Sequence, residues 1–170
     1  MNVTIFPLDR LMIDDISIPL GMERNRVEAL LGIGSTINNR YYYYNHEMAI
    51  DYDSNDKVEF IEFLGGIDGS LKPVIYGISA FDIESEEMLE ILKKNNNDTV
   101  DDSEPGYSYS FSNLSVGVYR EIRPEDVLEM IEEMKAEVIL TENNPILEND
   151  KRRAKHWSTI GFGVAGYYQK

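Results

Sequence analysis

The densest run of side chains that could bind a metal is an acidic stretch in the first half of the chain. Asp51, Asp53 and Asn55 alternate along it, and Glu62 follows at the spacing of a calcium-binding loop, which ends in a bidentate glutamate. Such a loop also needs glycine at its sixth place, where this chain has Asp56, and a helix on each side. The flanking residues do not have a helical pattern. We therefore predict a β-hairpin with a polar turn here, and no metal site.

The two histidines, His46 and His156, could in principle serve acid–base catalysis near neutral pH. Neither belongs to a recognisable nucleophile or ligand pattern, so we interpret both as turn or surface residues. The glycines Gly32 and Gly34 do not form a phosphate-binding loop, because no lysine follows and a helical pattern precedes them. The sequence therefore predicts no catalytic residue and no cofactor, and we expect that the protein is not an enzyme.

The charge balance points to a different kind of chemistry, the binding of a charged partner. The 170 residues include 31 acidic and 16 basic side chains, for a net charge of −15. This sign disfavours direct binding to nucleic acid or to an anionic membrane, and it favours a basic protein partner. Acidity also serves solubility, with no partner involved.

We predict a partner-binding site from the most acidic loop and from a run of tyrosines. The loop spans residues 98–106 and supplies Asp98, Asp101, Asp102 and Glu104. Alternation along a strand sends Tyr41 and Tyr43 to one face, and tyrosine is a common anchor at protein interfaces. One basic cluster runs from Lys151 to His156. We interpret its charges as balancing nearby carboxylates beside a helix, the alternative being an anion or partner contact.

The elements that would position these residues begin with a short amphipathic helix within Leu20–Gly32. Its apolar positions are Met22, Val27, Leu30 and Leu31, and Gly32 ends it in a left-handed conformation. Three strand patterns follow, at residues 40–45, 48–52 and 58–63, and together they predict an antiparallel meander.

This helix and the hairpin after it resemble a known repeat. Gly21, Val27, Leu31 and Gly32 match the helix signature shared by β-lactamase inhibitor proteins and small outer-membrane assembly lipoproteins, and the resemblance covers about residues 18–65. The chain departs from that pattern at Glu23, where serine or threonine usually caps the helix, and no proline follows the second glycine. It also has no cysteine, which the lipoproteins require. The resemblance implies a helix-plus-hairpin fold and an inhibitor-like, protein-binding function.

The remaining chain predicts several further elements. Before the helix we expect an edge strand at Val3–Phe6 and a short strand at Ile16–Ile18. After the meander we expect a loop at residues 65–70, a strand at 72–76, a helix at 83–95, a hairpin of strands 107–111 and 114–119, a helix from Pro124 to about Val138, a short basic helix at 146–155 and a strand at 157–168. The glycines in the last strand indicate close approach by a helix or a bulky aromatic ring.

We therefore predict an α+β fold in which helices pack on one face of an antiparallel sheet. The order helix, aromatic strand, strand recurs, so we interpret the chain as two degenerate tandem helix-hairpin repeats. The predicted halves are residues 1–70 and 71–170, or else one continuous domain. The N-terminus lacks the pattern of a signal peptide and no stretch could span a bilayer, so we expect a cytoplasmic protein.

Fold, charge and resemblance together predict a protein-binding module, namely a bacterial immunity or inhibitor-like protein that binds a basic partner. Two alternatives stay open. One is an uncharacterised enzyme or small-ligand binder with a site assembled from distant residues. The other is a structural subunit without a ligand, whose oligomeric state the sequence does not determine.

Overall fold

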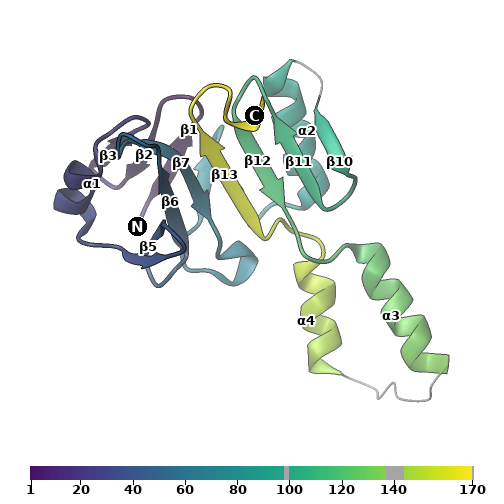
Figure 1. Ribbon diagram of the computed structural model, residues 1–170. Helices are drawn as coiled ribbons and strands as arrows, with labels where there is room; N and C mark the ends of the chain where they lie inside the picture. Colours follow the sequence, from purple (N-terminus) through teal and green to yellow (C-terminus); the bar gives the residue numbers. More distant parts are fainter. Residues whose placement is uncertain (98–99, 137–143, 170) are drawn as a thin grey trace.

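The computed structural model describes residues 1–97, 100–136 and 144–169. Four helices and mostly antiparallel strands form an open-sheet architecture, which confirms the predicted α+β class (Figure 1). Within these ranges, no helix combines the length and the apolar character that crossing a bilayer requires.

The larger sheet is antiparallel and has eight strands. From one edge to the other they are β10 (Asp101–Glu104), β11 (Ser108–Phe111), β12 (Val116–Tyr119), β13 (Thr159–Gly163), β7 (Val58–Phe63), β6 (Met48–Tyr52), β5 (Arg40–Tyr43) and β4 (Ser35–Ile37). Strands β5, β6 and β7 confirm the predicted meander, and β11 with β12 confirms the predicted hairpin. Because β13 pairs with β12 on one side and β7 on the other, the sheet continues across the boundary predicted at residues 65–70.

The smaller sheet has five strands, in the order β3 (Ile16–Pro19), β2 (Arg10–Ile13), β1 (Val3–Phe6), β8 (Pro73–Ile75) and β9 (Ile78–Ser79). The prediction that β1 is an edge strand was wrong, since β1 lies at the centre and pairs in parallel with β8. Sequence reasoning missed β2 because the turn before it contains no glycine. Leu8 adopts the left-handed conformation there, with φ of 63°.

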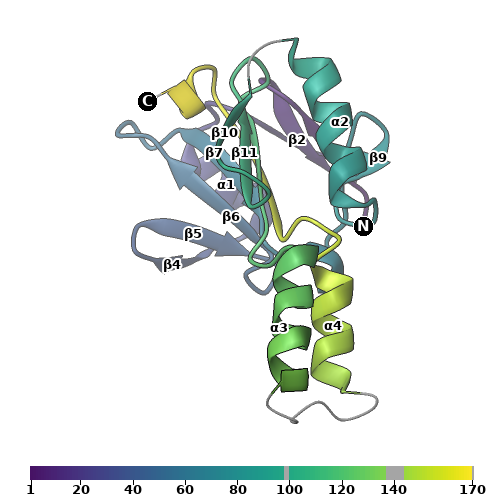
Figure 2. The same cartoon turned by 90° about the vertical axis from the view of Figure 1, so that its right-hand side faces the viewer.

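The helices are α1 (Arg24–Leu31), α2 (Ser85–Asn96), α3 (Pro124–Ala136) and α4 (Pro145–Arg153). Helix α2 lies beside the larger sheet near β11, whereas α3 and α4 project from the body as an antiparallel pair (Figures 1 and 2). The expectation of helices on one sheet face therefore describes α2 but not α3 and α4, which pack mainly on each other.

The side chains buried in the helices follow the helical period to different degrees. In α2 the side chains of Met88, Leu89 and Leu92 are all buried, at the spacing that places them on one face of a helix. In α1 Val27 is buried, whereas Leu30 is exposed. The third helix was expected to reach Val138, which lies outside the described residues.

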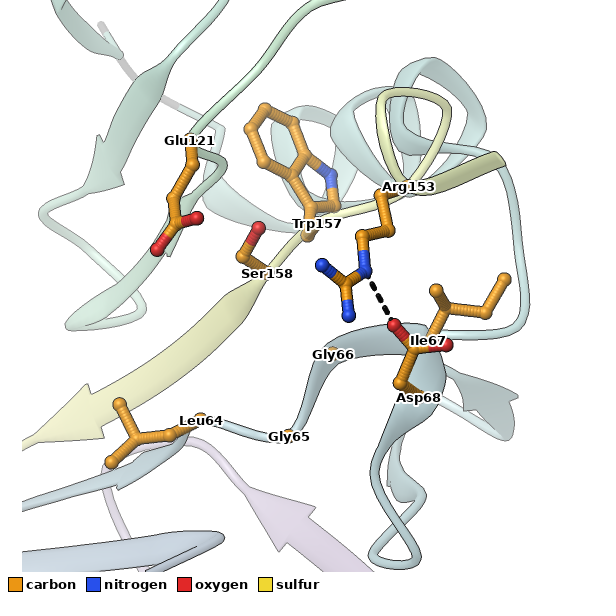
Figure 3. A pocket seen from close by; sticks show the side chains of 9 residues that line it. All are labelled: Leu64, Gly65, Gly66, Ile67, Asp68, Glu121, Arg153, Trp157 and Ser158. Atoms are coloured by element: carbon orange, nitrogen blue, oxygen red, sulfur yellow. Dashed lines mark hydrogen bonds and ion pairs between the residues drawn. The ribbon is translucent and has the colours of Figure 1, made fainter. Parts of the chain in front are cut away.

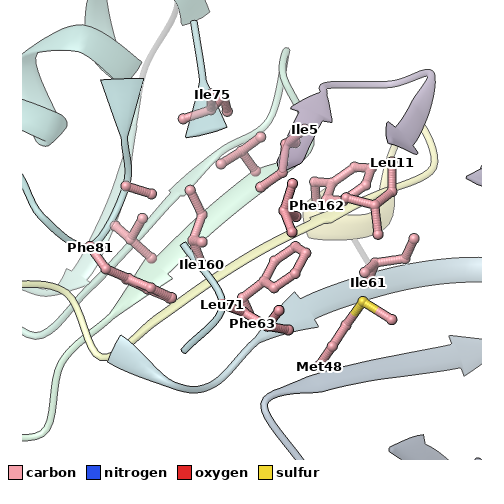
Figure 4. Close-up of a cluster of buried hydrophobic side chains, with 14 of the residues drawn as sticks. Ile5, Leu11, Met48, Ile61, Phe63, Leu71, Ile75, Phe81, Ile160 and Phe162 are labelled. Atoms are coloured by element: carbon pink, nitrogen blue, oxygen red, sulfur yellow. The ribbon is translucent and has the colours of Figure 1, made fainter. Parts of the chain in front are cut away.

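One hydrophobic core lies between the two sheets and α2. It contains residues from both predicted halves, including Ile5, Phe63, Phe81 and Phe162 (Figure 4). Strand alternation directs Phe63 and Phe162 to the inner face of the larger sheet. The outer face of the larger sheet carries the residues that alternate with these core positions along each strand.

Candidate functional site

The outer face of the larger sheet follows from the alternation of side chains along its strands. In β7, Ile61 and Phe63 enter the core, so Glu62 points to the other side. In β13, Ile160 enters the core, so Gly161, which pairs with Glu62, lies on the outer face. Helix α2 lies on the inner side of the sheet, and the short C-terminal turn η2 (Tyr167–Gln169) lies on the other (Figure 2).

The floor of the outer face is made of glycines that aromatic rings cover. A Cβ atom added to Gly161 would overlap the Phe60 ring, and one added to Gly117 would overlap Tyr168. The rings of Phe60 and Tyr167 stack with centroids 4.3 Å apart. The close approach of aromatic rings that the glycines of the last strand predict is therefore confirmed.

Beside these rings lies a hollow of about 330 Å³, which we call the first hollow. It is lined by Arg40, Asp51, Phe60, Glu62, Ser108, Tyr109, Gly117, Val118, Tyr119, Thr159, Tyr167 and Tyr168. Its charged part is the Arg40 guanidinium, which donates to Glu62 and lies 3.2 Å from an Asp51 carboxylate oxygen. The same guanidinium lies 5.9 Å from the centre of the Phe60 ring, a cation–π distance. This hollow therefore combines ion-pair and aromatic recognition groups.

Burial shifts the pKa values of groups in this hollow. It raises the pKa of the Asp51 carboxyl, while the Arg40 charge works in the opposite direction. It also raises the pKa of the Tyr168 phenol, and the Glu62 carboxylate adds to that effect. Tyr168 therefore stays neutral at physiological pH, with a hydroxyl that can donate a hydrogen bond.

A second hollow of about 470 Å³ adjoins the first, because Tyr119 lines both. Its other lining residues are Glu104, Pro105, Tyr107 and Glu121. The Tyr119 residue is 40% exposed and can contact a partner. The Tyr107 hydroxyl, in contrast, is held by donation to the Asp126 carboxylate at 2.8 Å.

We call the lining of the two hollows together the acidic outer surface. It carries four carboxylates and a single guanidinium. The carboxylates are those of Asp51, Glu62, Glu104 and Glu121. Its negative charge and exposed aromatic area make it a candidate surface for a basic, protein-sized partner.

The structure brings part of the predicted acidic loop to this surface. Glu104 lines the second hollow, while Asp101 and Asp102 are exposed on β10. The prediction of a loop was wrong for these residues, because they form the edge strand β10 on β11. Strand pairing there places Asp101 opposite Ser110. Asp98 lies outside the described residues.

The structure places Tyr41 and Tyr43 away from the acidic outer surface. Tyr43 is 6% exposed and belongs to the core, with its hydroxyl 3.4 Å from that of Tyr52. Tyr41 packs edge-on against Tyr52 and accepts a hydrogen bond from Arg24. The tyrosines that do line the surface come from other strands and from the C-terminal turn. Sequence reasoning missed them because cross-strand neighbours depend on the order of the strands.

The calcium-like stretch forms the predicted hairpin between β6 and β7. The Asp53 carboxylate accepts hydrogen bonds from the backbone amides of Asn55 and Lys57, at 2.8 and 2.9 Å, and so closes the turn. Among the described residues, no three histidine, aspartate or glutamate side chains are close enough together to hold a metal ion. His46 contacts the Ser35 hydroxyl, and His156 contacts the Ile83 carbonyl at 2.9 Å.

The basic cluster on α4 is engaged with nearby carboxylates, as predicted. Arg152 and Arg153 both contact Asp68, and the Lys151 ammonium lies 2.7 Å from Glu148. Figure 3 shows Arg153 reaching Asp68 across a pocket of about 170 Å³. The two arginine contacts attach the C-terminal end of α4 to the turn η1 (Gly66–Asp68).

Comparisons of this chain with family models, with curated proteins and with solved structures gave no match. The resemblance of residues 18–65 to the inhibitor-type repeat therefore stays a prediction.

Proposed function

We propose that this protein is a protein-binding module whose acidic outer surface receives a basic partner. One observation carries the proposal: four carboxylates and a single guanidinium line two adjoining hollows on a sheet face. A cationic partner is attracted by this local charge and by the net charge of −15.

The groups of the surface divide into two roles. Arg40 binds Asp51 and Glu62, so these carboxylates mainly shape the first hollow. Glu104 and Glu121 are exposed at the second hollow, where they can pair with lysine or arginine side chains. Between them, Tyr119 offers rigid apolar area with a polar tip, which suits the centre of an interface.

In its narrower form, the proposal assigns a bacterial immunity or inhibitor-like role in the cytoplasm. The resemblance of residues 18–65 supports this role, and so does the acidity, because a basic enzyme such as a toxin nuclease would be neutralised by an acidic binder. No catalytic step is part of the proposal.

The proposal is tested by affinity capture with three baits from an extract of the cells that produce the protein natively. The baits are the wild type, the surface variant Glu104→Gln/Glu121→Gln/Tyr119→Ala, and the matched control Glu129→Gln/Glu133→Gln/Tyr76→Ala. The control removes the same number of charges and one exposed tyrosine elsewhere. We expect a basic protein that the wild type and the control retain and the surface variant loses.

The same captured protein is then titrated against the wild type at two ionic strengths. Raising the salt from roughly 0.05 M to roughly 0.5 M shortens the Debye length several-fold, so we expect the affinity to fall markedly. Equal retention by the surface variant, or an affinity that does not change with salt, would contradict the proposal.

A small cationic ligand is a second candidate occupant. The volume of the first hollow, about 330 Å³, is that of a small-molecule site, and its aromatic rings suit a guanidinium or ammonium group. Titration with arginine methyl ester, followed by NMR, tests this candidate. Chemical-shift changes at Phe60 and Tyr168 that saturate with ligand concentration would support this candidate, whereas an unchanged spectrum would contradict it.

A further inference from the structure

The helix pair formed by α3 and α4 has a small core of its own. Its buried side chains are Val127, Leu147 and Ala154, and the partly buried Ile122 and Ile131 pack against them. The pair extends away from both sheets (Figures 1 and 2). One side of each helix is therefore left without a covering element from the described part of the chain.

On one side of the pair lies a groove of about 490 Å³ with a largely apolar floor. It is lined by Pro124, Val127, Leu128 and Ile131 from α3 and by Glu148, Lys151, Arg152, Lys155 and His156 from α4 and its end. Leu128 is 61% exposed in this groove. An exposed leucine beside a hollow indicates a surface that another apolar surface covers.

The charges that border the groove are self-complementary. On α3, Glu125 and Glu132 flank Leu128 one helical turn before and after it, so they lie along the same edge. The opposite edge carries Lys151 and Arg152 on α4 and Lys155 just after it, together with Glu148, which pairs with Lys151 at 2.7 Å. This edge is therefore basic overall. The face thus has an acidic edge, an apolar centre and a basic edge.

We propose that this face is the interface between two copies of the chain, closing a four-helix bundle. A two-fold axis parallel to the helices lays the acidic edge of α3 on the basic edge of α4 in the second copy. A two-fold axis perpendicular to the helices would instead place the acidic edges of the two α3 helices against each other. The charge pattern therefore favours the axis parallel to the helices. Each Leu128 then enters the groove of the other copy, and neighbouring helices run antiparallel.

A second copy is a better match than an unrelated partner, because the face has an acidic edge on α3 and an edge of net basic charge on and after α4. A strongly acidic or basic partner would meet repulsion at one edge. The inference is independent of the proposed function, since α3 and α4 do not line the acidic outer surface.

Sedimentation velocity of the full chain over a concentration series tests the interface. We expect the wild type to associate to a dimer as its concentration rises. Leu128→Glu places a charge in the apolar centre and should leave a monomer. The matched control is Ile146→Glu, because Ile146 is 72% exposed on α4 but does not line the groove, and this variant should still dimerise.

A charge exchange supplies the second test and does not disturb the apolar centre. Glu125→Lys should weaken the dimer at least tenfold, because Glu125 and Lys155 both lie at the body end of the helix pair and would then carry like charges. The double variant Glu125→Lys/Lys155→Glu should restore it, because it opposes unlike charges again. Circular dichroism verifies that each variant is folded. A wild type that stays monomeric, a double variant as weak as the single one, or equal effects of Leu128→Glu and Ile146→Glu would each overturn the proposal.

Discussion

The guanidinium carbon of Arg120 lies 5.0 Å from the centre of the Trp157 ring, in a cation–π contact inside the protein. Arg120 is 3% exposed and donates hydrogen bonds to the Ser85 hydroxyl at 2.7 Å and to the Ala154 carbonyl at 3.1 Å. It also lies 3.2 Å from the Glu86 carboxylate. This one side chain therefore connects β12, the start of α2 and the end of α4.

We predict that Arg120→Met lowers the free energy of unfolding by about 3 kcal/mol or more, because several buried acceptors lose their donor. Equilibrium denaturation followed by the fluorescence of Trp157, the single tryptophan, measures the change. Arg10→Met is the matched control, since Arg10 is exposed and pairs with Asp9 at the surface. Equal stability of the two variants would contradict the structural role of Arg120.

Replacing Gly161 tests the packing of the outer face. In Gly161→Ala the added methyl group meets the Phe60 ring, which stacking on Tyr167 holds in place. We predict a loss of about 1–3 kcal/mol, typical of overpacking. Gly117→Ala should cost less, because the atom that the added methyl group meets first is the hydroxyl at the far end of the Tyr168 side chain, which can move aside. Chemical denaturation measures the free energy of unfolding of both variants. A larger loss for Gly117→Ala than for Gly161→Ala would contradict the ring positions.

The pH dependence of α3 provides another test, through Asp126. Hydrogen bonds from Arg123 and from the Tyr107 hydroxyl lower the pKa of the Asp126 carboxyl well below its ordinary value. A carboxyl whose folded pKa is lowered stabilises the folded state above its unfolded pKa of about 3.9 and loses that contribution as the pH falls toward the folded pKa.

We therefore predict that Asp126→Asn weakens α3 at neutral pH and that the difference from the wild type shrinks as the pH falls below about 4. Amide hydrogen exchange in residues 124–136 measures the local opening. The control Glu129→Gln lies on the same helix and should show little change. If the difference in exchange between Asp126→Asn and the wild type grew as the pH fell, the result would contradict a stabilising ion pair between Asp126 and Arg123.

The parts of the fold that the sequence predicts well are those that local periodicity specifies. The meander of β5, β6 and β7 and the buried stripe of α2 follow from alternation and from the helical period. The position of β1 at the centre of a sheet does not, because its neighbour β8 comes from about seventy residues later in the chain. The sequence also does not predict that α3 and α4 project from the body, since an apolar stripe on a helix does not determine which surface the helix packs against.

The candidate site shows the same division between local and distant information. The net charge and Glu104 could be read from the sequence. The choice of Tyr41 and Tyr43 required knowing which face of β5 becomes the core, and strand alternation alone leaves that open. The meeting of Tyr119 with Glu121 and Glu104 depends on where β10 pairs, which is a property of the folded sheet.

The central claim is that a basic partner binds the acidic outer surface, and the most direct measurement is hydrogen exchange of the complex compared with the free protein. We predict slower exchange at residues 101–107 and 117–121, on the strands and turns that carry Glu104, Tyr119 and Glu121. Exchange in α1 should stay unchanged. Protection confined to α1 or to the α3–α4 pair, with no change at 101–107 and 117–121, would contradict the claim.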